Sequence, residues 1–238
     1  IRVKQLRSGC LVGRGEMPRR HGAERALNII DSSPTIKMTL IPDLVHNSLK
    51  KLYSHPSRHY HTLAHIEALL ALLSTHRDKF HDPEAVEAAI WFHDSIYDVN
   101  AQGNYNELQS AQLAGCMLLG LVDATRLKGI QAMIEATAAH MVPDLPSAEA
   151  VADAALFLDM DLSILGADEE VFDEYEMAVR KEYARVSDEA WREGRAAVLR
   201  KFLGREWIYH SGLFRGLLEE KARANLRRSV ERLGGSGS

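Results

Sequence analysis

Histidine and aspartate stand side by side near the end of an apolar run, AIWFHDSIYD, at residues 89–98. Polar side chains in such a run lose their hydration and need a compensating partner. A divalent metal ion is one such partner. The alternative is an ordinary internal hydrogen bond, from His93 to Asp94 or to a backbone carbonyl. The pair alone does not separate the two, so the remaining ligands decide.

Further candidate ligands lie on core-facing positions elsewhere in the chain. His65 belongs to the apolar stripe of a helix expected over residues 60–75. In FLDMDLSIL, Asp159 and Asp161 lie inside an apolar run, and the spacing of Asp161 from the neighbouring leucines turns its carboxylate toward the core. Two imidazoles and two carboxylates suit Mn, Fe, Co, Ni, Zn or Mg. Such a set leaves coordination positions open for water and substrate, which favours a catalytic metal site over separate internal hydrogen bonds.

The composition fits one large globular domain and excludes several classes of function. The chain has 238 residues, 46% of them hydrophobic, and a formal net charge of −4 without a long basic run, which argues against binding to a nucleic-acid polymer. Two distant cysteines, Cys10 and Cys116, form neither a disulfide framework nor a thiolate zinc motif. No apolar stretch reaches the roughly 20 residues that span a bilayer. Seven of the 11 histidines lie between His55 and His93, which points toward metal or acid-base chemistry.

The two ends of the chain differ in composition from the centre. Residues 1–37 are basic, contain scattered glycine and lack periodicity, so we expect a poorly ordered arm without the apolar core of a signal peptide. Residues 234–238, GGSGS, are typical of a flexible tail. The domain is therefore expected over residues 38–233. Reduced cysteines and the missing signal peptide favour the cytoplasm.

Helical periodicity runs through this domain, and proline and glycine fall mainly at the junctions. No alternating strand pattern occurs, which predicts an all-α, single-domain helical bundle. Asp82 is the expected N-cap of the helix that ends on the His-Asp pair. The expected helices cover residues 42–53, 60–75, 83–94, 106–119, 124–141, 148–165, 169–184, 188–203 and 213–233.

The order and spacing of four segments, RHYHTLAHI, WFHDSIYD, NELQSA and FLDMDLSILG, resemble the HD superfamily of metal-dependent phosphohydrolases, over about residues 40–233. The resemblance implies an HD-type helical bundle and identifies the metal ligands as His65, His93, Asp94 and Asp161, with Asp159 as the substitute if the register of the last motif is shifted. HD enzymes with two metals generally have two further histidines before the last aspartate. This chain has one, His140, so we expect one divalent ion.

The implied activity is hydrolysis of a phosphate ester or phosphoanhydride in a nucleotide-like small molecule, with metal-activated water as the nucleophile. A carboxylate near the metal would orient that water. Glu107 is the first candidate and Asp98 the second, although an acid at the start of a helix can equally serve the helix dipole. The alternatives are a non-catalytic metal-containing binding module and, less favoured, an HD-type iron oxygenase.

Five further residues are candidates for binding the substrate. Arg58 and His61 could hold phosphate oxygens, although a surface ion pair is the alternative for Arg58. Thr137 and His140 could line the pocket opposite, and His140 could instead be a hydrogen-bonded core histidine. Tyr97 could stack on a base, although packing is the more frequent role of such a tyrosine.

Overall fold

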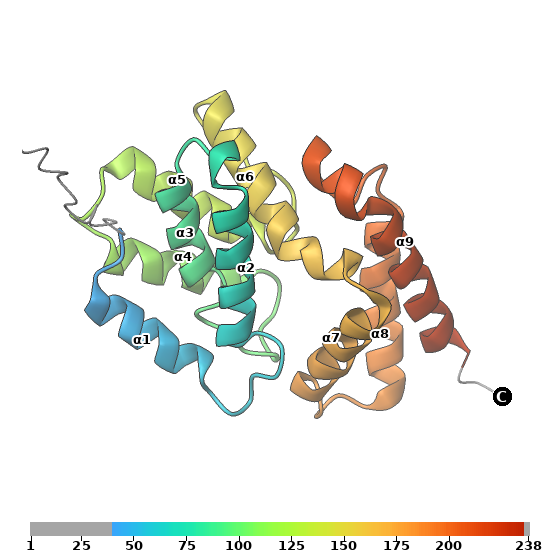
Figure 1. Ribbon diagram of the computed structural model, residues 1–238. Coiled ribbons are helices and arrows are strands. Elements are labelled where there is room, and N and C mark those ends of the chain that lie inside the picture. The colour runs from blue at the N-terminus through green and yellow to red at the C-terminus, as the bar shows by residue number, and fades with distance from the viewer. Residues whose placement is uncertain (1–39, 236–238) are drawn as a thin grey trace, which may run out of the picture. The chain divides into compact units, whose positions relative to one another are not determined.

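The computed structural model describes residues 40–235, and the basic arm expected at 1–37 lies outside this range. Within it the chain forms α-helices and two short 3₁₀ helices and contains no strand, as the sequence predicts (Figure 1). No helix in the described part is both long and apolar enough to cross a membrane. The elements are α1 (Asp43–Tyr53), α2 (Leu63–Thr75), η1 (Arg77–Lys79), α3 (Pro83–Phe92), α4 (Tyr105–Met117), α5 (Ala124–Ala136), α6 (Ala148–Asp161), η2 (Leu162–Gly166), α7 (Glu169–Glu182), α8 (Asp188–Leu203) and α9 (Gly212–Gly234).

Helix α3 is the centre of the α1–α6 part of the domain and contacts α1, α2, α4, α5 and α6 (Figure 1). Its N-terminus forms as predicted, because the Asp82 side chain accepts a hydrogen bond from the backbone amide of Ala85 and Pro83 occupies the first turn. Most of its remaining residues are buried, and three of them are alanines that allow neighbouring helices to approach closely. The helix ends with His93 at its C-cap, and this side chain is buried.

Three helix ends differ from the prediction by three or more residues. Helix α6 ends at Asp161 rather than at residue 165, because the 3₁₀ helix η2 follows it. At the other two ends, side chains bind the backbone nearby. Helix α2 begins at Leu63 rather than at residue 60, since Glu182 accepts hydrogen bonds from the backbone amides of residues 59–61. Helix α5 ends at Ala136 rather than at residue 141. His140 has a φ of 47°, in the left-handed region that a right-handed helix cannot include.

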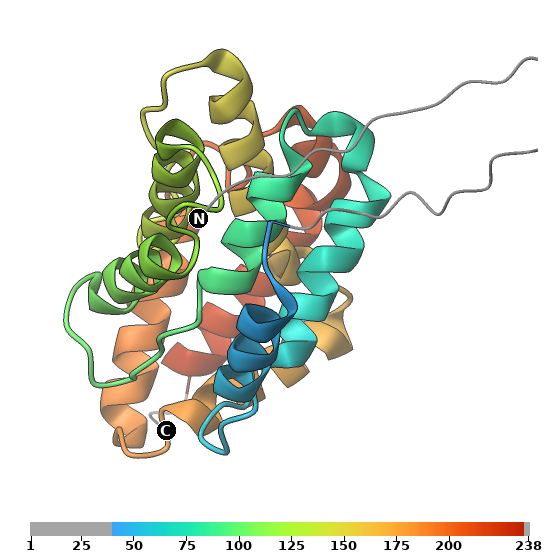
Figure 2. The same ribbon diagram turned by 90° about the vertical axis from the view of Figure 1, so that its left-hand side faces the viewer.

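Helices α8 and α9 lie side by side, and α9 also contacts η2 (Figures 1 and 2). Gly166, at the end of η2, permits this close packing, because an added Cβ would lie 2.6 Å from the Cβ of Leu218. The connection through η2 follows directly after Asp161, the last residue of α6. Asp161 therefore lies where the α6 helix gives way to the elements that contact α7 and α9.

Candidate metal centre

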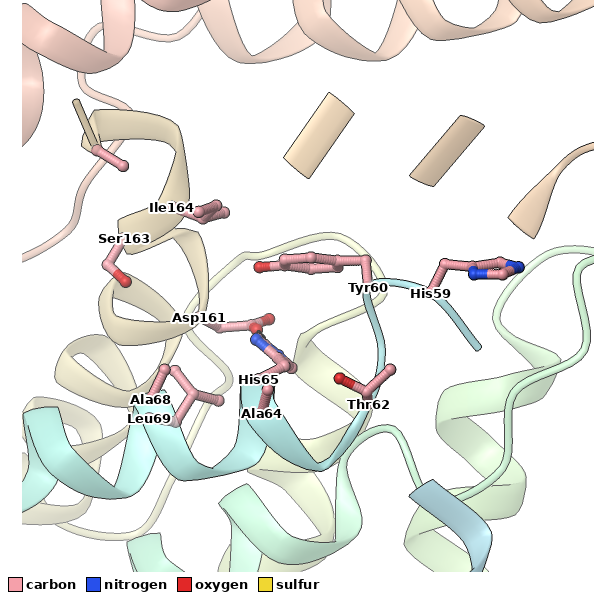
Figure 3. A pocket seen from close by; sticks show the side chains of 11 residues that line it. His59, Tyr60, Thr62, Ala64, His65, Ala68, Leu69, Asp161, Ser163 and Ile164 are labelled. Carbon is pink, nitrogen blue, oxygen red and sulfur yellow. Dashed lines mark ion pairs between the residues drawn. The ribbon is translucent and has the colours of Figure 1, made fainter. Parts of the chain in front are cut away.

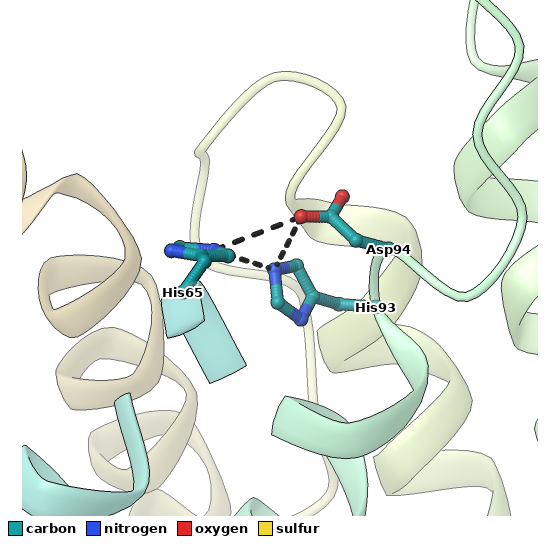
Figure 4. Close-up of side chains that lie close together, drawn as sticks. All are labelled: His65, His93 and Asp94. Atoms are coloured by element: carbon teal, nitrogen blue, oxygen red, sulfur yellow. Dashed lines mark hydrogen bonds and ion pairs between the residues drawn. The ribbon is translucent and has the colours of Figure 1, made fainter. Parts of the chain in front are cut away.

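The side chains of His65, His93 and Asp94 lie close together (Figure 4). His65 belongs to the first turn of α2, and His93 and Asp94 directly follow α3. Their ligand atoms all lie within 4.8 Å of one another. The two histidine Nε2 atoms are 3.2 Å apart, and Asp94 Oδ2 lies 3.0 Å from His93 Nε2 and 3.6 Å from His65 Nε2. Such a group could hold a metal ion.

Asp161 brings a fourth ligand atom to the same place from the end of α6. Its Oδ1 lies 3.2 Å from His65 Nε2 and 3.5 Å from His93 Nε2. The side chains of His65 and Asp161 point toward one another beside Tyr60 (Figure 3). Metal bonds of about 2.1 Å place adjacent ligand atoms about 3.0 Å apart at right angles and about 3.4 Å apart in a tetrahedron. The distances among His65, His93 and Asp94, and those from Asp161 to the two histidines, therefore fit ligands of a single ion. These four residues are called the ligand cluster below.

The orientation of His93 also fits metal binding. Its Nδ1 lies 2.9 Å from the carbonyl oxygen of Ile90, so the neutral ring carries its proton on Nδ1 and presents the Nε2 lone pair to the cluster. Burial lowers the pKa of His93, but the charges of Asp94 and Asp161 outweigh it and raise that pKa well above 6.5. Burial likewise opposes ionisation of the two carboxyls, yet the histidines hold both of their pKa values low. The cluster therefore favours a positive charge at Nε2, as a proton or as a cation.

Asp159, the substitute ligand, is occupied elsewhere. Its carboxylate accepts hydrogen bonds from the backbone amides of His210, at 2.6 Å, and Ser211, at 2.7 Å, and it is fully buried. Asp159 thus satisfies the backbone that leads into α9. Of the two aspartates, Asp161 is the one that lies in the ligand cluster.

A cavity of about 580 Å³ opens on the cluster and contains the expected catalytic carboxylate. Asp94, Asp161 and Glu107 all line it. Glu107 Oε2 is buried without a hydrogen-bond partner among the described residues. Burial, together with the charge of Asp94, raises the pKa of Glu107 above 4.5. An unpaired carboxylate oxygen in the cavity of the ligand cluster is suited to accept a proton or orient a water.

Thr137 and His140 line the same cavity, as expected from the sequence. His140 Nε2 lies 2.8 Å from Asp161 Oδ2, so it contacts the carboxylate oxygen opposite the one that faces the cluster. The Thr137 hydroxyl donates to the carbonyl oxygen of Ile134. His140 is therefore placed to orient Asp161.

Arg58 and Asp98 both make hydrogen bonds within the chain. The guanidinium of Arg58 donates to the carbonyl oxygens of His61, Asp94 and Ser95 at 2.8–3.0 Å, so it braces the segment after α3, and Arg58 is not among the residues that line the cavity. Asp98 is exposed, and its Oδ1 accepts from the backbone and side-chain nitrogens of Asn100. Asp98 lines the cavity but its carboxylate organises a turn.

Sequence reasoning missed Glu182, at the end of α7, which organises the segment before α2. One oxygen accepts the backbone amides of residues 59–61 at 2.7–3.0 Å. The other lies 2.7 Å from His61 Nδ1 and accepts from the Tyr97 hydroxyl at 2.9 Å. Tyr97 in turn packs on the His61 ring with centroids 4.2 Å apart. His61 and Tyr97 do line the cavity, but Glu182 and this packing hold them in place.

Replacing Glu182 by alanine is expected to lower the free energy of unfolding by about 2–4 kcal/mol, because several buried donors lose their acceptor. Denaturant unfolding in the presence of a chelator measures this without a contribution from metal. Burial opposes ionisation of Glu182, but His61 and the backbone amides lower its pKa from 4.5 to about 2. Its contribution should accordingly be present above pH 4.5 and fade as the pH falls toward 2.

The matched control is Glu170→Ala, an exposed acid on the same helix. We expect this variant to change the stability by less than about 0.5 kcal/mol. Equal stabilities of the two variants would contradict the role given to Glu182.

Comparison of the chain with family models, curated proteins and solved structures found no match.

Proposed function

We propose that the protein is a metal-dependent phosphohydrolase that acts on a nucleotide-like small molecule. One observation carries the proposal: His65, His93 and Asp94 have the spacing of ligands of a single ion, and Asp161 lies beside the two histidines, at a cavity that Glu107 also lines. His65, His93, Asp94 and Asp161 would hold one divalent ion such as Mn, Mg, Co, Ni, Fe or Zn. The two carboxylates of this set, Asp94 and Asp161, suit ions that also bind phosphate oxygens.

A bound ion would supply positive charge to the phosphoryl oxygens and would acidify water. The protein side chains then have separate tasks. Glu107 Oε2 accepts a proton from the attacking water or orients it, since this oxygen is buried and unpaired and burial raises the pKa of Glu107 above 4.5. His140 holds Asp161 in its orientation through the contact with Oδ2.

Helix α8 supplies a wall of the cavity that suits a flat, partly apolar group. On this side the lining of the cavity includes Trp191, Gly194 and Val198, which lie on successive turns of α8. Trp191 already packs against Tyr183, with ring centroids 5.5 Å apart, so its indole is held in place. Aromatic side chains of this kind stack on nucleobases. A Cβ on Gly194 would meet nothing within 4 Å, so the helix leaves open space there.

Filling that space is expected to select against large substrates. Gly194→Leu should raise the KM for a nucleoside monophosphate about tenfold, whereas the kcat/KM for methyl phosphate should change little. Leucine also favours the helix over glycine by about 1 kcal/mol, so the fold should survive. Steady-state kinetics with both substrates measure the difference.

Gly216→Leu is the matched control, because Gly216 is an exposed glycine within α9 whose added Cβ would also meet nothing within 4 Å. Gly216→Leu should leave the KM for the nucleoside monophosphate and the kcat/KM for methyl phosphate unchanged. Equal kinetics for the two leucine variants would show that the α8 wall does not contact the substrate.

The proposal is tested by metal analysis together with a screen of nucleotides and simple phosphoesters under Mn, Mg, Co and Ni. We expect phosphate release with at least one metal and a melting temperature that falls on chelation, because an ion bound only to the folded state stabilises it. A tightly held metal without turnover on any substrate would instead favour a binding module. A melting curve that EDTA does not change would contradict metal binding at these positions.

A further inference from the structure

A second cavity, of about 280 Å³, adjoins the metal centre beneath the end of α8. It shares Asp161 and His140 with the larger cavity. Its wall contains three basic side chains, Arg195, Lys201 and Arg205. Such a concentration is notable in a chain whose formal net charge is −4. A ligand held at the ligand cluster could therefore extend into a basic space.

The three basic side chains differ in whether an acid already neutralises them. Arg195 is paired, because its Nε donates to Glu176 Oε1 at 3.0 Å. Arg205 instead donates to the carbonyl oxygens of Ala139, at 2.6 Å, and His140, at 3.0 Å. No carboxylate in residues 40–235 forms an ion pair with Arg205 or with Lys201. Two positive charges in this cavity are thus left without a counter-charge from the described chain.

Arg205 is also held in a fixed position. Its guanidinium lies over the Phe202 ring, 4.6 Å from the ring centroid, and the two carbonyl contacts anchor its nitrogens. Burial lowers its pKa, and no other group offsets that effect. The charge of Arg205 is therefore partly desolvated, and only carbonyl oxygens and a ring face compensate it, so it can attract an anion.

We propose that Lys201 and Arg205 bind a second anionic group of the substrate, a phosphate next to the phosphoryl group at the ligand cluster. The inference rests on the proposed function for the position of the first phosphoryl group. It narrows the substrate class from phosphate esters in general to molecules with a second phosphate group. The shared lining residues Asp161 and His140 place the two groups in neighbouring cavities.

The first test measures binding of inorganic pyrophosphate to the full chain by calorimetry in excess EDTA, where no hydrolysis is possible. Lys201→Met should weaken binding about threefold, which is the effect of losing one exposed charge contact. Arg200→Met, the adjacent position on α8, removes the same charge outside the cavity and should bind as the wild type does. Equal affinities for the two variants, or no binding by the wild type at millimolar concentration, would overturn the proposal.

The second test uses Arg205, whose contacts also brace the segment before His140. Arg205→Met should weaken pyrophosphate binding about tenfold, and Arg205→Lys should restore part of it because the charge returns. Pyrophosphate affinity that falls in Arg205→Met and partly returns in Arg205→Lys would support the second-phosphate site. If no phosphoester is hydrolysed in the same experiments, the proposed activity fails while this site is retained. With an active enzyme, Lys201→Met should raise the KM for a nucleoside diphosphate and leave that for the monophosphate unchanged. A uniform change in both KM values would contradict a second-phosphate site.

Discussion

Asparagine in place of Asp94 is expected to weaken metal binding at least about a hundredfold and to reduce phosphate release at least about a thousandfold. The substitution keeps the size of the side chain but removes the charge of an oxygen that lies 3.0 Å from His93 Nε2 and 3.6 Å from His65 Nε2. The backbone carbonyl of Asp94, which accepts from Arg58, is unaffected. Metal titration by calorimetry and a phosphate-release assay measure the two effects separately.

A matched variant shows whether the effect is specific. Asp144→Asn alters an exposed aspartate outside the ligand cluster and should leave both metal affinity and turnover unchanged. The melting temperature of the EDTA-treated Asp94→Asn protein reports on folding, independently of metal. Retained metal binding and activity in Asp94→Asn would remove Asp94 from the site.

The positions of the two histidine ligands could be predicted because the spacing of apolar residues along a helix indicates which side chains are buried. His65 and His93 lie on apolar helix faces, and both are buried. The apolar run does not by itself distinguish Asp159 from Asp161, since both aspartates lie in it. Their side chains turn in different directions from the end of α6, and the binding partners of Asp159 come from residues 210 and 211, far along the chain. Spacing indicates which side chains are buried but not which distant backbone meets them.

The residues that sequence reasoning missed act over long distances in the chain. Glu182 binds the amides of residues 59–61 from the end of α7, and no spacing rule links the two segments. Arg58 has the positive charge that a phosphate site needs, but its guanidinium donates hydrogen bonds to three backbone carbonyl oxygens. A single arginine in a sequence does not reveal whether its donors will be used internally. The α8 wall was missed for a related reason, because the exposed small residues Ala190 and Gly194 show no amphipathic signal of a cavity.

Glutamine in place of Glu107 is expected to lower kcat by about a hundredfold to ten-thousandfold, the usual contribution of a general base. The metal affinity should change little, since no contact within the ligand cluster involves Glu107. Glu107 Oε2 is a buried oxygen without a partner, so an amide of the same shape removes the proton acceptor without breaking a hydrogen bond of that atom. Single-turnover measurements at saturating metal separate this loss in rate from a loss of substrate binding.

The pH dependence distinguishes a base from an oxygen that only fills space. Burial raises the pKa of Glu107 above its ordinary 4.5, and a base is active when deprotonated. Activity should therefore fall as the pH drops through a value above 4.5, and this acid limb should disappear in the weakly active Glu107→Gln enzyme. Glu135→Gln, an exposed position on α5, serves as the control and should retain the wild-type profile. An unchanged acid limb in Glu107→Gln would assign the titration to another group, because a glutamine cannot accept the proton that the limb reports.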